Sequence, residues 1–149
     1  MRLVLQRVAS ARVEVAGERV GAIGRGLLVL AGVESGDGAA QVDAAADKLL
    51  GLRVFEDERG RMNLDLRQTG GAVLLVSQFT LAASTDRGRR PSFDGAAPAE
   101  VARPLLERLR ARLAAAGVRI EEGRFGAHMA VDLVNDGPVT FVLEIPPGD

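Results

Sequence analysis

One stretch decides the fold of this chain: Ala72-Val73-Leu74-Leu75-Val76-Ser77-Gln78-Phe79-Thr80-Leu81. Its first five residues form an uninterrupted apolar run, rich in β-branched side chains, which is typical of a strand buried on both faces. The run then changes abruptly to hydroxyl and amide side chains around an aromatic residue. A strand that ends in this way can hold polar groups rigidly at a cleft. The same residues can also satisfy the backbone of an ordinary strand end.

Working outward, hydrophobic patterning predicts a chain made mostly of strands. A second buried strand is expected at residues 27–33. Shorter strands are expected at residues 2–8, 12–15, 19–23, 53–55, 62–66, 119–121, 128–134 and 139–145.

Helical spacing predicts two helices. The first is expected to start after an N-cap at Asp37 and to run to about residue 52. The second is expected between Pro98 and Gly117, with Pro104 either kinking it or delaying its regular part to about residue 103. Its residues facing the core are expected to be Val101, Leu105, Leu109 and Leu113. Because strands and helices do not alternate strictly, we expect an α+β fold with a curved, largely antiparallel, barrel-like sheet and two main helices. One domain is expected over residues 1–145, followed by a disordered tail at 146–149.

Composition narrows the possible functions. The 149 residues, with 47% hydrophobic and 26% charged side chains, suit one soluble globular domain, and no apolar run is long enough to span a bilayer. The N-terminal residues do not have the pattern of a signal peptide, so we expect a cytoplasmic protein without a membrane partner. The absence of cysteine excludes thiolate nucleophiles and cysteine metal sites. With one histidine, His128, and no phosphate-binding glycine motif, no metal and no cofactor are expected.

A long polar loop follows the opening stretch and contains Arg87, Arg89 and Arg90. These arginines either face a phosphate backbone or are simply solvated. The net charge of −1 gives no sign of a nucleic-acid partner from the chain as a whole.

Two motifs together identify a family resemblance. Ser77-Gln78-Phe79-Thr80-Leu81 and Asn135-Asp136-Gly137-Pro138-Val139-Thr140, in this order and at this spacing, resemble the D-aminoacyl-tRNA deacylase family. Further matching stretches make the resemblance span residues 1–145: Gln6-Arg7-Val8, Gly26-Leu27-Leu28-Val29-Leu30, Met62-Asn63-Leu64 and Arg87-Gly88-Arg89-Arg90-Pro91-Ser92-Phe93.

The resemblance implies an esterase that releases D-amino acids from the 3′ end of aminoacylated tRNA. It implies a homodimer with its active site at the subunit interface. The Gly137–Pro138 bond would be cis and would reach into the site of the partner, although only about 5–6% of X–Pro bonds in folded proteins are cis.

On this reading Ser77, Gln78, Phe79 and Thr80 flank the scissile ester, and backbone N–H groups near Phe79 and Thr80 form an oxyanion hole. Our hypothesis is that water attacks with help from the ribose 2′-OH, because no base is in view to activate Thr80 as a nucleophile.

The substrate-binding residues implied by the resemblance are Gly137, Pro138, Phe125, Met129 and Arg7. Phe125 and Met129 would line an adenosine pocket, or else simply pack in the core. Arg7 would brace the Gly-Pro motif, or else be a surface charge at a strand edge. His128 receives no role. The alternatives to the enzyme are a non-catalytic dimeric module that binds RNA or amino acids, and a hydrolase of small metabolites that never meets RNA.

Overall fold

A computed structural model describes residues 1–147 of the chain. The strands are β1 (Arg2–Val15), β2 (Glu18–Ile23), β3 (Gly26–Gly32), β4 (Phe55–Glu56), β5 (Met62–Leu64), β6 (Ala72–Ser77), β7 (Ile120–Glu122) and β8 (Ala130–Glu144). The helices are α1 (Ala39–Gly51), α2 (Leu66–Thr69), the 3₁₀ helix η1 (Phe79–Ala82) and α3 (Ala99–Ala115). Residues 148 and 149 of the expected disordered tail lie outside the described part. No helix within residues 1–147 is both long and apolar enough to cross a membrane.

The main sheet is mixed and strongly curved. Its order is β2-β1-β3-β6-β7, and β8 pairs with β1 on the side away from β3. β1 is antiparallel to β2, β3 and β8, whereas β6 is parallel to both β3 and β7. The curvature brings β2 so close to β7 that a Cβ atom at Gly21 would collide with the Glu122 carbonyl. This arrangement confirms the α+β class and the barrel-like sheet.

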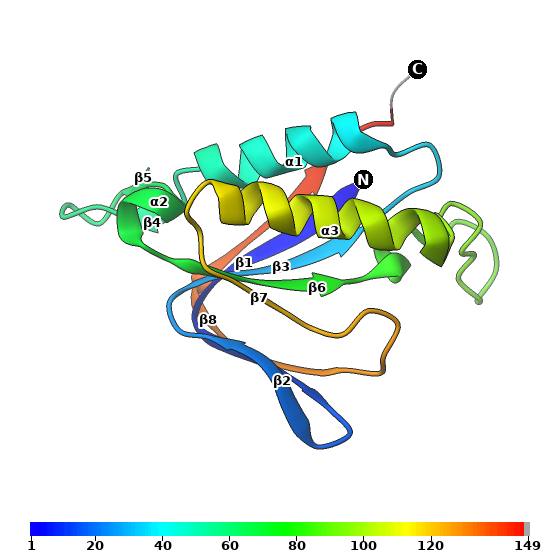
Figure 1. The fold of residues 1–149 in the computed structure, drawn as a ribbon, viewed down its shortest axis with the longest axis horizontal. Helices are drawn as coiled ribbons and strands as arrows, with labels where there is room; N and C mark the ends of the chain where they lie inside the picture. The colour runs from blue at the N-terminus through cyan, green and yellow to red at the C-terminus, as the bar shows by residue number, and fades with distance from the viewer. Residues whose placement is uncertain (148–149) are drawn as a thin grey trace.

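Both faces of the sheet are covered. Figure 1 shows α1 and α3 lying side by side over one face, while β2 and β8 curve away below the other. β6 is buried on both faces, as its apolar run predicts, because successive side chains point to opposite sides. Val73 and Leu75 join the core beneath the helices, and Leu74 and Val76 join a second core inside the curve. The strand that leads into the Ser-Gln-Phe-Thr segment is therefore enclosed on both faces as far as Val76.

Two pairs of expected strands are each one continuous strand. The expected strands at 2–8 and 12–15 are the two halves of β1, which pairs first with β3 and then with β2. Those at 128–134 and 139–145 form β8, in which residues 135–139 bulge and shift the register against β1 without ending the pairing. The sequence pattern predicts two strands in place of each long one, because small or turn-forming residues interrupt the alternation of apolar side chains in the middle of β1 and β8.

The second helix starts where expected, with Pro98 as its N-cap, and runs through Pro104 without interruption. Of the side chains expected to face the core, Leu109 and Leu113 are buried, but Val101 and Leu105 are not. Val101 is 41% exposed, and in the first half of the helix Ala102 and Leu106 are buried instead. A strict four-residue spacing drifts around a helix of 3.6 residues per turn, so the stripe that faces the sheet changes along α3.

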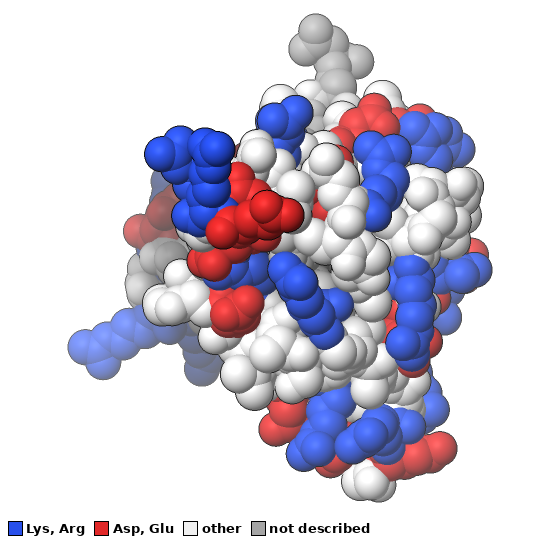
Figure 2. Space-filling model, turned by 90° about the vertical axis from the view of Figure 1, so that its left-hand side faces the viewer, with Lys and Arg blue, Asp and Glu red and all other residues white. Residues whose placement is uncertain are grey.

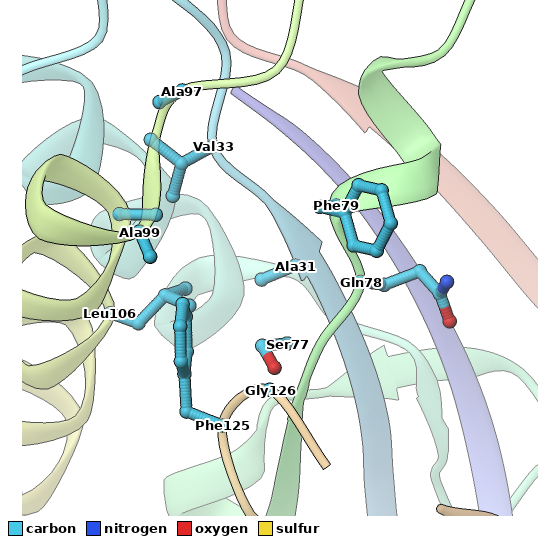
Figure 3. Close-up of a pocket in the computed structure, with 11 residues that line it drawn as sticks. Ala31, Val33, Ser77, Gln78, Phe79, Ala97, Ala99, Leu106, Phe125 and Gly126 are labelled. Carbon is cyan, nitrogen blue, oxygen red and sulfur yellow. The ribbon is translucent and has the colours of Figure 1, made fainter. Parts of the chain in front are cut away.

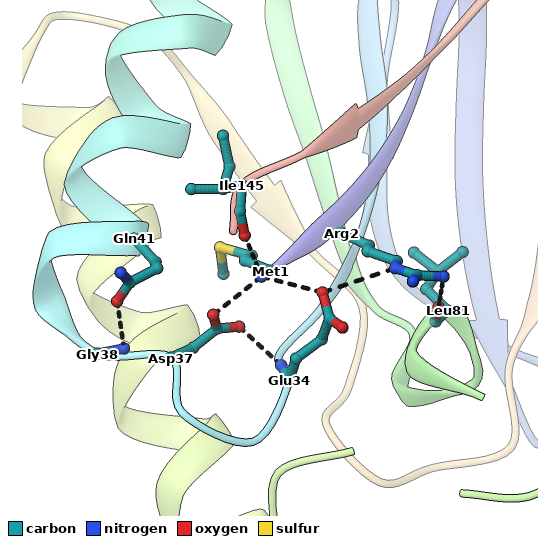
Figure 4. Close-up of polar contacts among 8 residues, drawn as sticks. All are labelled: Met1, Arg2, Glu34, Asp37, Gly38, Gln41, Leu81 and Ile145. Atoms are coloured by element: carbon teal, nitrogen blue, oxygen red, sulfur yellow. Dashed lines mark hydrogen bonds and ion pairs between the residues drawn. The ribbon is translucent and has the colours of Figure 1, made fainter. Parts of the chain in front are cut away.

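The start of α1 also differs from the prediction. Gly38, not Asp37, is the N-cap, and its N–H donates to the Gln41 side chain at 2.8 Å. The Asp37 carboxylate instead accepts hydrogen bonds from the Met1 ammonium (2.9 Å) and the Glu34 backbone N–H (2.7 Å). The ammonium also donates to the Ile145 carbonyl at 2.7 Å. This network, drawn in Figure 4, joins the start of β1 to the segment after β8 and to the β3–α1 connection.

Candidate active site

The candidate site begins where β6 leaves the sheet. Ser77 pairs with Ala31 of β3, and the Gln78 N–H extends this ladder by donating to the Ala31 carbonyl at 2.8 Å. The chain then turns into η1. Gly32 permits this turn to lie against β3, because a Cβ there would come within 2.7 Å of the Gln78 carbonyl oxygen and 2.9 Å of Leu81 Cβ.

The start of η1 leaves two backbone N–H groups of the described chain, those of Phe79 and Thr80, free to bind a ligand. The amides that follow are paired within the helix. The Leu81 N–H donates to the Gln78 carbonyl at 3.2 Å, and the Ala83 N–H donates to the Thr80 carbonyl at 3.1 Å. The N–H groups of Phe79 and Thr80, which open the 3₁₀ helix, find no acceptor within residues 1–147. Two adjacent unpaired amides at a strand end can bind a developing negative charge.

The hydroxyl of Thr80 accepts a hydrogen bond from the Gln78 side-chain amide. Within residues 1–147 no histidine or carboxylate is hydrogen-bonded to Thr80 or to Ser77. An activated hydroxyl nucleophile requires such a base. The arrangement therefore suits positioning of a substrate or water better than covalent attack by Thr80.

A cavity of about 310 Å³ opens beside this strand end. Figure 3 shows Phe125 and Phe79 on opposite sides of it, with Ser77 and Ala31 between them. Its walls are apolar and come from β3, η1, α3 and the connection after β7. The lining residues are Ala31, Val33, Ser77, Gln78, Phe79, Ala97, Ala99, Ala102, Leu106, Phe125 and Gly126.

A second cavity of about 230 Å³ shares Ser77, Gln78 and Phe79 with the first and is also lined by Met129 and His128. Phe125 and Met129 thus both reach the expected site. Each also packs against a core cluster, so the two interpretations of these residues are compatible. His128, to which the sequence assigns no role, lies beside the site.

Arg103 of α3 was not expected near the site. Its guanidinium carbon lies 4.5 Å from the centre of the Phe125 ring, a cation–π contact that holds this wall of the cavity in place. Nothing in the sequence pattern singles out this contact, because Arg103 and Phe125 belong to separate elements.

The Gly-Pro motif lies in the bulge of β8. The Gly137–Pro138 peptide bond is cis, the geometry that the resemblance implies, and both residues are exposed. Gly137 has a φ of +153°, and a Cβ there would lie 2.6 Å from the backbone nitrogen of Val139. The Asn135 side chain closes the bulge by accepting from the Val139 N–H (2.9 Å) and donating to the carbonyls of Val139 (3.0 Å) and Arg7 (3.3 Å).

Arg7 supports this bulge from below. Only 5% of Arg7 is exposed, which rules out the alternative of a surface charge. Its guanidinium donates to the carbonyls of Asp136 (3.0 Å) and Val54 (2.8 Å), and it lies 3.4 Å from the Asp136 carboxylate and 3.6 Å from that of Glu56. The expected bracing position of Arg7 therefore agrees with its contacts, and Asn135 shares this part.

Within one chain the two motifs lie far apart. Arg7 is in register with Leu27 of β3 and so with Val73 at the start of β6, whereas Ser77 is at its end. Four residues of strand separate these levels by about 13 Å. The bulge also lies on β8, with β1 and β3 between it and β6. The structure thus gathers Ser77, Gln78, Phe79, Thr80, Phe125 and Met129 at one place and Arg7, Gly137 and Pro138 at another.

Comparison with known proteins agrees with this reading of the motifs. The family model described as D-Tyr-tRNA(Tyr) deacylase matches residues 4–144. A protein named D-aminoacyl-tRNA deacylase from Alcanivorax borkumensis is 53% identical over 97% of this chain and all of its own length. One of the same name from Symbiobacterium thermophilum is 56% identical over 97% of this chain and 95% of its own.

Two solved structures share the fold. The structure titled c-Myc DNA Unwinding Element Binding Protein is 41% identical, with a TM-score of 0.92 over 98% of this chain and 99% of that one. A probable eukaryotic D-amino acid tRNA deacylase, 19% identical, shares the fold with a TM-score of 0.85 over 95% of this chain and 97% of its own. From the family model and the curated relatives together, the chain belongs to the D-Tyr-tRNA(Tyr) deacylase family.

Proposed function

We propose that this protein hydrolyses the ester bond between a D-amino acid and the 3′-terminal adenosine of tRNA, releasing the free D-amino acid and tRNA. The observation that carries the proposal is the position of two unpaired backbone amides, of Phe79 and Thr80, beside an apolar cavity in a chain of this family. The cavity walls suit the adenine ring, and the amides suit the ester carbonyl. Charged tRNA is made in the cytoplasm, and we place the reaction there.

In this mechanism a water molecule attacks the ester carbonyl carbon. The carbonyl oxygen becomes an oxyanion and is bound by the N–H groups of Phe79 and Thr80. The C–O bond to the ribose 3′ oxygen then breaks, this oxygen takes up a proton, and the amino acid leaves as a carboxylate. The neighbouring 2′-OH orients the water and relays a proton, since no side-chain base contacts Thr80 within residues 1–147. Gln78 fixes the Thr80 hydroxyl beside the ester.

The site is completed by a second subunit. Since Gly137 and Pro138 lie at the opposite end of the sheet from Ser77 within one chain, they meet the ester only from a partner. β8, which carries them, also exposes three large apolar side chains. These are Val134 (57% exposed), Phe141 (38%) and Val142 (66%). Large apolar side chains left exposed on a strand that pairs on one side only favour contact with another chain.

Selection for D-amino acids follows from main-chain contacts. The carbonyl oxygens of Gly137 of the partner subunit and Pro138 of the partner subunit accept hydrogen bonds from the substrate α-ammonium. With the ammonium and the ester carbonyl both fixed, only one direction remains for the substituent on Cα. A D side chain points outward, whereas an L side chain runs into the backbone and is rejected. Glycine has no Cβ and escapes this rejection.

The test is release of amino acid from one tRNA charged in turn with a D-amino acid, its L enantiomer and glycine. We expect release from the D-aminoacyl and glycyl forms and none from the L form. Binding of D-aminoacyl-tRNA without release would identify a non-catalytic module. Failure of uncharged tRNA to compete would favour a hydrolase of small metabolites. Complete protection of glycyl-tRNA would contradict selection by the backbone alone.

A further inference from the structure

We propose that residues 84–93, named here the arginine loop, bind the single-stranded nucleotides that precede the terminal adenosine of the tRNA. This proposal rests on the proposed function and adds to it the place where the RNA chain leaves the active site. In Figure 1 the loop extends beyond the sheet at the end of β6, next to η1 and the start of α3.

The arginine loop has a defined shape. Ser84 and Ser92 exchange two backbone hydrogen bonds of 2.8 Å each, which close the loop at its base. Gly88 reverses the chain at the tip with a φ of +66°, a conformation that favours glycine. A loop closed in this way presents its side chains from a limited set of positions, so less freedom is lost when it binds a ligand.

The loop holds three arginines without acidic partners. Arg87, Arg89 and Arg90 are exposed, and none forms an ion pair within residues 1–147. Asp86 lies within the loop and Asp94 follows it. Their backbone N–H groups donate to the hydroxyls of Ser84 and Ser92, and neither carboxylate forms an ion pair with the three arginines. By contrast, three arginines of α3 are paired with carboxylates: Arg108, Arg110 and Arg112.

The loop ends in an aromatic surface that continues from the active site. Phe93 is 44% exposed, and its ring centre lies 5.3 Å from that of Phe79, with the two planes tilted by 58°. Phe79 is itself 58% exposed and lines the candidate cavity. A nucleotide that follows the adenosine out of the cavity would therefore meet an exposed ring for its base and arginines for its phosphate. This combination is the usual platform for single-stranded RNA.

The chain does not offer RNA a broad basic surface on every side. On the face drawn in Figure 2, basic and acidic side chains are interspersed and form no broad basic area. The net charge of the chain is −1. Local contacts to a few phosphates, rather than a general attraction, are what such a chain can offer to RNA.

The experiment compares two substrates. One is D-tyrosyl-tRNA, and the other is the D-tyrosyl 3′-ester of adenosine, which has no phosphate. The variants are Phe93→Ala and the triple change Arg87→Gln, Arg89→Gln and Arg90→Gln. We expect each to raise KM for the tRNA substrate about 5- to 100-fold and to leave hydrolysis of the adenosine ester unchanged. The triple variant should also flatten the dependence of log KM on log salt by about 2, or about 0.7 for each lost phosphate contact.

The matched controls lie around the β4–β5 turn. The side chains of Arg59, Arg61 and Arg67 are likewise exposed and form no ion pair within residues 1–147, and Met62 is 48% exposed. Changing the three arginines to Gln, or Met62 to Ala, should alter neither substrate. Thermal unfolding of each variant checks that the fold is retained.

The outcomes separate the two proposals. An unchanged tRNA KM in the loop variants, or an equal loss with both substrates, would overturn the arginine loop as an RNA site. Failure of the wild-type protein to hydrolyse either substrate would overturn the proposed function instead. In that case binding of uncharged tRNA still tests the loop, because equal Kd values for wild-type and loop variants would refute it.

Discussion

Arg7, together with Asn135, connects the fold to the Gly-Pro motif. The Arg7 guanidinium donates hydrogen bonds in two directions, to the carbonyl of Val54 before β4 and to the carbonyl of Asp136 in the β8 bulge. Lysine carries the same charge on a single flexible ammonium and cannot span two carbonyls in fixed directions. The position of the motif therefore depends on the shape of the guanidinium as well as its charge.

We expect Arg7→Met to lower the free energy of unfolding by about 1–3 kcal/mol, since the buried Val54 carbonyl loses its donor. Deacylation activity should fall as well, because the bulge loses its support. Urea unfolding and kcat/KM measure the two effects. Arg12→Met, on the same strand but at an exposed ion pair with Asp132, is the control and should cost less than about 1 kcal/mol. Equal losses in both variants would contradict a special part for Arg7.

Thr80→Ala distinguishes water attack from covalent catalysis. Because the backbone donors remain and only a positioned hydroxyl is lost, we expect substantial deacylation by this variant. Mass spectrometry of the wild-type protein, quenched during turnover, should find no acylated Thr80. Inactivation with an intact fold, together with a trapped acyl-enzyme, would overturn the water mechanism.

The part of the site that sequence predicts is the part that is contiguous along the chain. Ser77 to Thr80 follow an apolar strand, and this pattern alone places them at its exposed end. The burial of Arg7 could not be predicted, because its acceptors at residues 54 and 136 are remote in sequence. The contact of Arg103 with Phe125 is missed for the same reason.

Between α1 and α3 the most specific polar contact is the pair of Asp43 and Arg108. Two hydrogen bonds of 2.9 Å join the guanidinium to both carboxylate oxygens. The hydrogen bond from Arg108 is the main cause that lowers the pKa of Asp43 below its usual value. The pair thus links the two helices that cover one face of the sheet, and it does so only while Asp43 is ionised.

A pH dependence of stability follows from this lowered pKa. The stabilisation is complete above the unfolded-state pKa of about 3.9 and is lost as the pH falls through the lower folded-state pKa. We expect Asp43→Asn to unfold at lower urea concentration than wild type at pH 6, and the difference to shrink steadily below about pH 4. Asp47→Asn, with a 73% exposed side chain and one 3.6 Å contact to Arg112, should leave the midpoint unchanged. A difference that persisted at pH 2 would exclude the ionic origin.

The elements that the sequence predicts best are the strands buried on both faces of the sheet. The strand at 72–76 and its neighbour at 27–33 appear as expected because burial on both faces demands continuous apolar residues. The long strands β1 and β8 are split by the sequence pattern, because cross-strand pairing and not local preference carries the chain through their bulges. The buried face of α3 is likewise set by the sheet beneath it.

The separation of the two motifs makes a prediction about the assembled protein. Ser77→Leu fills the cavity, and Gly137→Ala introduces a Cβ where Val139 leaves no room, so each variant alone should be inactive. If a site takes one motif from each subunit, mixing the two variants restores one intact site in half of the dimers, about a quarter of wild-type activity. Coexpression followed by the deacylation assay measures this. No recovery, despite heterodimers seen by native mass spectrometry, would place both motifs in one subunit.

Gly32 has a consequence beyond its place in β3. It contacts no substrate in the mechanism, yet any side chain there would push η1 outward and carry the Phe79 and Thr80 amides with it. Gly32→Ala should therefore fold normally, with a lower kcat than the wild-type protein and an unchanged affinity for aminoacylated tRNA. A screen for variants that are soluble but inactive should therefore recover substitutions of Gly32, because catalysis depends on the absence of a side chain at this position.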